Sequence, residues 1–139
     1  MTRDEAQRLV QAFMKSLGQA SEGLNPQGFG GAAIGNAQLY FEYHADKQVL
    51  ETSALIYKFR DPPKPGVLEG FRAEEKSGTD TGGGAVDYET ENNSLFLSRT
   101  YASVPSEAAF REDMKRLTQA SLVWADEVMD RVASRVFKR

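Results

Sequence analysis

Few side chains in this sequence are of a type that could carry out catalysis or bind a transition metal. His44 is the only histidine and there is no cysteine, so neither a Cys–His pair nor a cysteine-type zinc site can form. His44 ends an alternating segment beside a turn, where a histidine is ordinarily a solvated surface residue. A metal site would then rest on carboxylates alone, and we expect no catalytic residue and no bound metal.

Alternating carboxylates are the clearest pattern that could hold a cation. Asp87, Glu89 and Glu91 share one face of an expected strand. A hard cation usually gathers about six or more oxygen ligands, and the spacing of a calcium-binding loop is absent. We interpret these residues as the solvated face of a strand.

A glycine cluster at Gly78 to Gly84 invites comparison with phosphate-binding loops. It lacks the Gly-Lys-Ser/Thr ending of such a loop, and an expected helix precedes it where a strand is required. We therefore interpret it as a flexible turn that enters a strand, and we expect no cofactor.

Aromatic side chains gather on the expected strands between residues 37 and 59. A stacking platform for single-stranded nucleic acid would pair such rings with a basic groove. The middle of the chain is instead acidic, because residues 69–91 carry seven acidic and only two basic residues. Core packing and a protein-binding face account better for the rings.

The overall charge excludes further classes of partner. Seventeen Lys and Arg residues against twenty Asp and Glu residues give 139 residues a net charge of −3, which argues against nucleic-acid binding and against a basic helix on a membrane surface. No apolar run approaches the roughly 20 residues that span a bilayer. Met1–Glu5 is not a basic segment followed by an apolar stretch, so we expect no signal peptide. We expect one cytoplasmic domain, residues 1–139, with no nucleic-acid or membrane partner.

Hydrophobic periodicity predicts three helices and two groups of strands. The helices are expected over 2–17, 67–76 and 106–137, where Thr2 with Glu5 forms a capping box and Ser106 is the N-cap of the last helix. A hairpin is expected over 37–59, preceded by a short strand in the glycine-rich segment 23–35. A second hairpin is expected over 85–89 and 95–102, joined by an Asn-rich turn.

This order of elements predicts an α+β fold, α-βββ-α-ββ-α. An antiparallel sheet of about five strands would be covered on one face by an N-terminal helix, a short middle helix and a long C-terminal helix. The other face, or an edge, remains available to a partner.

Two apolar sets are candidate interaction surfaces. The short middle helix carries Val67, Leu68 and Phe71 on one side, and because so short an element is not stable alone, we expect these residues to form a homodimer interface. The first hairpin offers more apolar area than one helix face needs. Its candidates for binding a client protein are Leu39, Phe41, Tyr43, Leu55 and Tyr57.

The C-terminal half resembles a known family. The segments 78–88 and 93–99 look like the two-strand segment of type III secretion chaperones of the CesT (Tir chaperone) group, and Phe110, Leu117 and Trp124 match the spacing on the helix that follows. The chain differs from that pattern in its glycine-rich first strand and in a basic last turn (Arg135, Lys138 and Arg139).

The resemblance implies a small acidic homodimer without catalytic activity. Such a chaperone holds the extended N-terminal segment of a secreted effector against apolar patches, with strand addition at a sheet edge. An alternative is an adaptor or regulatory domain of the same fold that binds a folded signalling partner. An enzyme that relies on carboxylates is the third alternative.

Overall fold

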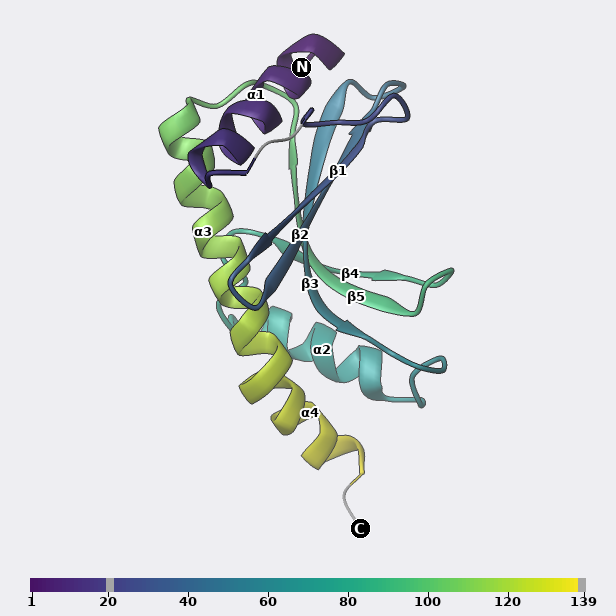
Figure 1. Cartoon of the computed structure of the whole chain (residues 1–139). Coiled ribbons are helices and arrows are strands. Elements are labelled where there is room, and N and C mark those ends of the chain that lie inside the picture. Colours follow the sequence, from purple (N-terminus) through teal and green to yellow (C-terminus); the bar gives the residue numbers. More distant parts are fainter. Residues whose placement is uncertain (20–21, 138–139) are drawn as a thin grey trace.

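A five-stranded antiparallel sheet is covered on one face by helices (Figure 1). The computed structural model describes residues 1–19 and 22–137, so Lys138 and Arg139 of the basic last turn lie outside the described residues. The elements in chain order are α1 (Arg3–Ser16), β1 (Phe29–Ile34), β2 (Ala37–His44), β3 (Val49–Lys58), α2 (Val67–Lys76), β4 (Ala85–Glu89), β5 (Ser94–Tyr101), α3 (Glu107–Val123), the π-helical turn η1 (Trp124–Val128) and α4 (Met129–Val136). The α+β class and the expected order of elements are confirmed.

The sheet has the strand order β1-β2-β3-β5-β4, and every neighbouring pair is antiparallel. β3 and β5 are antiparallel neighbours in the interior of the sheet, although α2 and β4 lie between them in the sequence. Figure 1 shows the long C-terminal helix running along one side of the sheet, from α1 at one end to α2 at the other. The strands β1 and β4 therefore form the two edges.

Local signals in the sequence explain where several elements begin and turn. Thr2 Oγ1 accepts a hydrogen bond from the Glu5 amide (3.2 Å), while Glu5 Oε1 accepts one from the Thr2 amide (2.8 Å), so the capping box of α1 is present. Ser106 caps α3 by accepting from the Ala109 amide. Asn93 adopts a φ of 51° in the turn between β4 and β5, as the Asn-rich sequence predicts.

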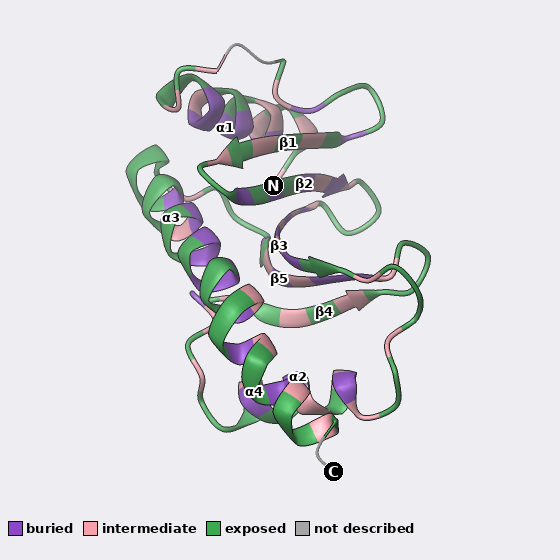
Figure 2. Cartoon of the chain, turned by 60° about the horizontal axis from the view of Figure 1, so that its bottom comes forward, coloured by how far each residue is buried: buried purple, intermediate pink, exposed green. Residues whose placement is uncertain are grey.

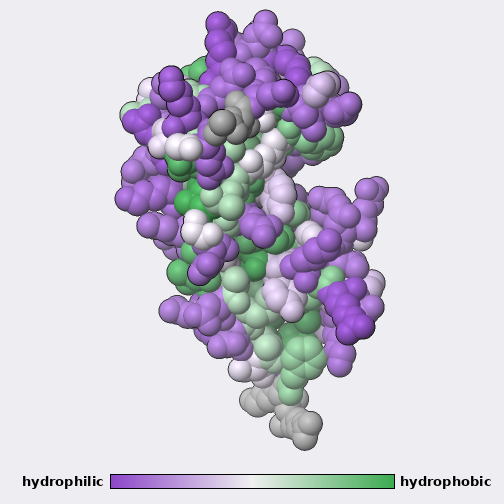
Figure 3. Space-filling view, viewed as in Figure 1, coloured by the Kyte–Doolittle hydropathy of each residue, from purple (hydrophilic) through white to green (hydrophobic). Residues whose placement is uncertain are grey.

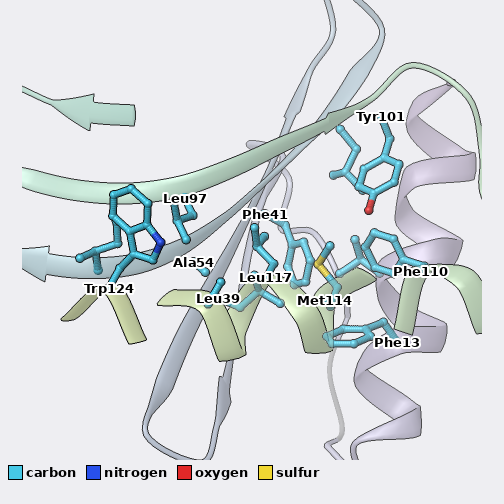
Figure 4. Packing of buried hydrophobic residues seen from close by; sticks show 14 of the residues in the cluster. Phe13, Leu39, Phe41, Ala54, Leu97, Tyr101, Phe110, Met114, Leu117 and Trp124 are labelled. Carbon is cyan, nitrogen blue, oxygen red and sulfur yellow. The ribbon is translucent and has the colours of Figure 1, made fainter. Parts of the chain in front are cut away.

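The core lies between the sheet and the helices α1 and α3. Figure 2 shows the buried sides of these helices turned toward the strands. At one end, Phe13 of α1, Phe41 of β2 and Phe110 of α3 pack with ring centroids 5.5–6.2 Å apart (Figure 4). Edge-to-face ring pairs stabilise a core beyond the area they bury. This cluster holds both helices on the same face.

Trp124 forms the other end of the core. Its ring is fully buried and stacks on Phe71 of α2, with centroids 6.1 Å apart. Its indole N–H donates to the backbone carbonyl of Asp80 (2.8 Å), so the one polar atom of the ring is satisfied. Phe110 and Leu117 are fully buried as well, so all three residues of this spacing on the last helix lie in the core.

The last helix is interrupted where the sequence predicts a continuous one. A π-helical turn occupies residues 124–128 and shifts the following residues around the helix axis. The segment beyond it, α4, packs against α2. Gly70 of α2 allows this close approach, because a Cβ at Gly70 would lie 2.7 Å from Cγ1 of Val132.

A buried carboxylate joins α2 to α4. Glu74 is buried and receives hydrogen bonds from Arg131 (2.7 Å), from Arg135 and from the Thr79 hydroxyl (3.0 Å). The hydrogen bond from Arg131 is the main reason that the pKa of Glu74 falls to about 2. The charged form of Glu74 therefore stabilises the folded chain.

We predict that acid weakens the contact of α2 with α4. Because folding lowers the pKa of Glu74 from 4.5 to about 2, its contribution is complete above pH 4.5 and is lost as the pH falls toward 2. Glu74→Gln should lower the free energy of unfolding at pH 7 by about 1.5–3 kcal/mol, the contribution typical of a hydrogen bond to a charged group. Urea titrations at pH 7 and pH 3 should show a smaller pH effect in the variant. Glu69→Gln, on the exposed side of α2, is the control, and an equal loss in both variants would contradict the prediction.

We also predict that Trp124 reports the integrity of the core. As the only tryptophan, it should emit at a blue-shifted wavelength in the native protein and shift to the red on unfolding. Trp124→Ala should cost about 3–5 kcal/mol of unfolding free energy. Leu122→Ala, on the exposed side of α3, should change it by no more than about 0.5 kcal/mol. A water-like emission maximum in the native protein would refute the packing of the ring.

Candidate functional site

The two faces of the sheet differ in what covers them. Along β2, Leu39, Phe41 and Tyr43 are buried under α1 and α3, whereas Tyr40 and Glu42 point to the opposite, open face. The expected client-binding candidates Leu39, Phe41 and Tyr43 are therefore part of the chain's own core. The alternation in the sequence groups these residues correctly, but it does not say which face the helices cover.

The open face carries the remaining candidates and several aromatic residues. Leu55 is half-buried there, and Tyr57 is 47% exposed at the end of β3. Tyr40 is 43% exposed and its ring meets the ring of Phe96 edge-on, with centroids 6.0 Å apart. Phe29, on the edge strand β1, is 49% exposed. Sequence reasoning did not select Phe29 or Phe96, although Phe96 alternates with buried residues of β5.

A groove of about 480 Å³ follows this open face. The strand register places one row of mainly small side chains across this face of the sheet. That row contains Gly31, Tyr40, Ser53, Ser98 and Ala85, of which Tyr40 and Ser53 line the groove. The hydroxyl groups of Ser53 and Ser98 form a hydrogen bond of 2.8 Å across it. Leu55 and Phe96, which are opposite each other in the next row on this face, line the groove as well.

The walls of the groove are mainly acidic. The charged residues that line it are Glu42, Glu51, Lys58, Asp87 and Glu89. Four carboxylates against one lysine favour a cationic occupant. Of the three carboxylates that the sequence groups on one strand face, Glu91 lies in the turn after β4 and is not among the lining residues.

The glycine cluster before β4 serves packing against α3. Gly82 is buried, and a Cβ there would lie 2.4 Å from the backbone oxygen of Arg116. The Gly82 amide donates to Oδ1 of Asp80 (2.8 Å), whose backbone oxygen accepts from Trp124. The interpretation as a flexible turn missed this close approach, which only glycine permits.

The expected dimer patch is largely covered by the chain itself. Val67 and Phe71 are buried against the core, and Leu68 is half-buried. The physical reason is that apolar residues of α4, among them Val132 and Val136, pack against the same side of α2. Val67 and Phe71 are therefore not available to a second copy, which corrects that expectation.

An apolar surface does remain beside this patch, between the end of β3, the segment that follows β3, and α4. It surrounds a hollow of about 260 Å³, and its lining includes Tyr57, Phe59, Pro62, Met129 and Phe137. Phe137 is 50% exposed. The ring of Phe59 packs edge-on against the ring of Tyr57, with centroids 4.9 Å apart. Figure 3 shows apolar side chains along the lower half of the molecule, toward the C-terminus. Isolated exposed rings are common, but a contiguous apolar group usually marks a contact site.

No helix within residues 1–19 and 22–137 is long and apolar enough to cross a membrane.

Comparisons with known proteins identify the fold. No protein-family model and no curated protein matches the sequence. A chain from the crystal structure of the ExsC–ExsE complex superimposes with a TM-score of 0.71 at 15% identity, covering 90% of this chain and 95% of that chain. A chain from the HopA1–SchA chaperone–effector complex superimposes with a TM-score of 0.67 at 14% identity, covering 89% and 95%. This protein has the fold of the type III secretion chaperones.

Proposed function

We propose that this protein is a non-catalytic chaperone that holds an extended N-terminal segment of a client effector. The observation that carries the proposal is the groove on the open face, which combines exposed rings with acidic walls and is not covered by the chain's own helices. The fold also supports a chaperone function, because one of the similar structures is a complex of a chaperone with an effector.

The sheet offers two modes of contact to such a segment. In the described part of the chain, β4 has one side without a neighbouring strand, so an extended peptide can add its backbone hydrogen bonds there. On the outer side of β1, the backbone oxygens of Phe29 and Ala33 already accept hydrogen bonds from the Asn25 amide and the Gln19 side chain. Apolar side chains of the peptide can pack on Tyr40, Leu55 and Phe96 at the groove floor. Coverage of these exposed rings keeps both proteins soluble.

The charge of the groove defines which segments fit. With Glu42, Glu51, Asp87 and Glu89 along its walls, the groove favours a client segment in which apolar residues alternate with Lys or Arg. Charge pairs at an exposed groove act mainly on the association rate, and salt weakens them. This pattern separates a basic client from an acidic one of equal hydrophobicity.

We further infer that the protein is a homodimer through the apolar surface around Tyr57, Phe59 and Phe137, together with half-buried Leu68. Tyr57, Phe59 and Phe137 line the same hollow, and Leu68 lies on α2 next to Val67, which also lines it. Burial of one large apolar side chain contributes roughly 1.5–3 kcal/mol, so a two-fold contact that doubles this set can hold two copies together.

We predict that a labelled basic, apolar peptide from the N-terminus of a neighbouring gene product binds the groove. Fluorescence anisotropy should show weaker binding by Tyr40→Ala and Phe96→Ala, by roughly five- to 30-fold each, as expected for the loss of one ring contact of 1–2 kcal/mol. Leu122→Ala removes an exposed side chain from α3 and is the matched control. Raised salt should lower the association rate of the wild-type protein.

Other outcomes would change the assignment. Binding of folded partners only, with no peptide bound, would replace the chaperone with the adaptor alternative. Peptide binding that both groove variants retain at full strength would place the client elsewhere on the molecule. Turnover of a small molecule that disappears with one carboxylate would favour the enzyme alternative.

We predict that Phe137→Glu or Tyr57→Glu shifts the protein from dimer to monomer in light scattering. Each change introduces a charge into the apolar contact, while neither side chain belongs to the buried core. Val104→Glu alters an exposed apolar residue on another part of the chain and should leave the dimer intact. A monomeric wild-type protein, or a dimer in both variants, would contradict this interface.

A further inference from the structure

Three side chains with metal-ligating atoms meet on the open face near the β2–β3 turn. The register places Glu42 directly opposite Glu51, and His44 follows Glu42 by two residues on the same face of β2. The His44 Nε2 atom lies 3.1 Å from Glu51 Oε1, and its Nδ1 atom lies 3.6 Å from Glu42 Oε2. Taking one donor atom from each residue, the three donors lie within 4.8 Å of one another.

The two carboxylates need a positive charge between them. Like charges directly opposite each other across two strands destabilise the pair. Within residues 1–19 and 22–137, His44 is the only basic side chain within ion-pair distance of Glu42 or Glu51. A divalent cation at this point would place further positive charge between the two carboxylates.

We propose that Glu42, His44 and Glu51 form a binding site for a divalent transition-metal ion of the Zn²⁺ type. Zinc accepts an imidazole nitrogen and carboxylate oxygens with bonds of about 2.0–2.2 Å, which puts tetrahedral donors about 3.4 Å apart. Donors that already lie within 4.8 Å reach this spacing through small rotations of side chains that are only half-buried. One ring nitrogen binds the ion, and water completes the coordination.

The donor set also separates this ion from harder cations. An imidazole nitrogen suits Zn²⁺, Ni²⁺ and Cu²⁺, whereas Ca²⁺ requires six to eight oxygen ligands and Mg²⁺ prefers oxygen donors as well. Two carboxylates and one imidazole are too few ligands for Ca²⁺. The site should therefore prefer Zn²⁺ to Mg²⁺ and Ca²⁺.

The position of the site links it to the groove without depending on the proposed client. Glu42 and Glu51 line the groove as well, so a bound ion would remove two of its negative charges and present an open coordination position to whatever lies there. Metal binding by the free protein is measurable whether or not a client segment binds. Failure of one proposal therefore leaves the other intact.

Titration calorimetry of the full chain with Zn²⁺ alone tests the site. We expect saturable binding of one ion per chain. His44→Ala and Glu51→Gln should each weaken it by at least the roughly 10–100-fold that removal of an outer-shell partner typically costs. Glu89→Gln removes a carboxylate from the opposite wall of the same groove and should bind Zn²⁺ as the wild-type protein does. Because His44 is the only histidine, its ring proton resonances should shift on addition of Zn²⁺ and identify the ligand directly.

Three results would overturn the proposal: no saturable Zn²⁺ binding by the wild-type protein, equal binding by His44→Ala, or equal affinities for Zn²⁺ and Mg²⁺. The last two would show an acidic surface that attracts cations in general. Circular dichroism of each variant establishes that it is folded, and His44→Gln, which keeps a polar side chain at this position, provides a second test of the imidazole.

Discussion

The arrangement of this protein depends on the packing of two helices against the same face of the sheet. Phe13, Phe41 and Phe110 bring α1, β2 and α3 together in one cluster of rings. Side chains alternate between the faces of a strand, so burial of one face under helices necessarily turns the other set of side chains outward. The groove, its rings and its carboxylates all result from that choice of face. Nothing in the described part of the chain covers the open face.

The contact between α2 and α4 determines the other surface of the molecule. The carboxylate of Glu74 forms ion pairs with two arginines of α4, while Gly70 lets Val132 approach the α2 backbone. The π-helical turn before α4 rotates that segment, which then meets α2. Because α4 occupies the apolar side of α2, the residues left exposed are those at the rim of this contact. The apolar surface around Tyr57 and Phe137 is thus a consequence of intrachain packing.

Local patterns in the sequence were sufficient for the elements and the fold class. The capping box at Thr2 and Glu5, the apolar spacing of Phe110, Leu117 and Trp124, and the alternation along β2 each depend on neighbours close in sequence. The site was harder to predict, because it depends on which strands pair and which face is covered. Glu42 and Glu51 are opposite each other only through the register of β2 with β3, and an analysis of His44 alone does not bring them together. The burial of Phe71 was missed for the same reason, since its partner Trp124 lies far along the chain.

The open face departs from what stability alone would favour. A stable sheet face would pair opposite charges across the strands, yet Glu42 faces Glu51, and rings such as Tyr40 and Phe29 remain about half exposed. Departures of this kind concentrate at functional sites in natural proteins, where stability is exchanged for interaction. The core on the other face, with its stacked rings and satisfied indole, follows the ordinary rules of packing. The contrast between the two faces, which the same strands build, is the strongest structural reason to place the function on the open one.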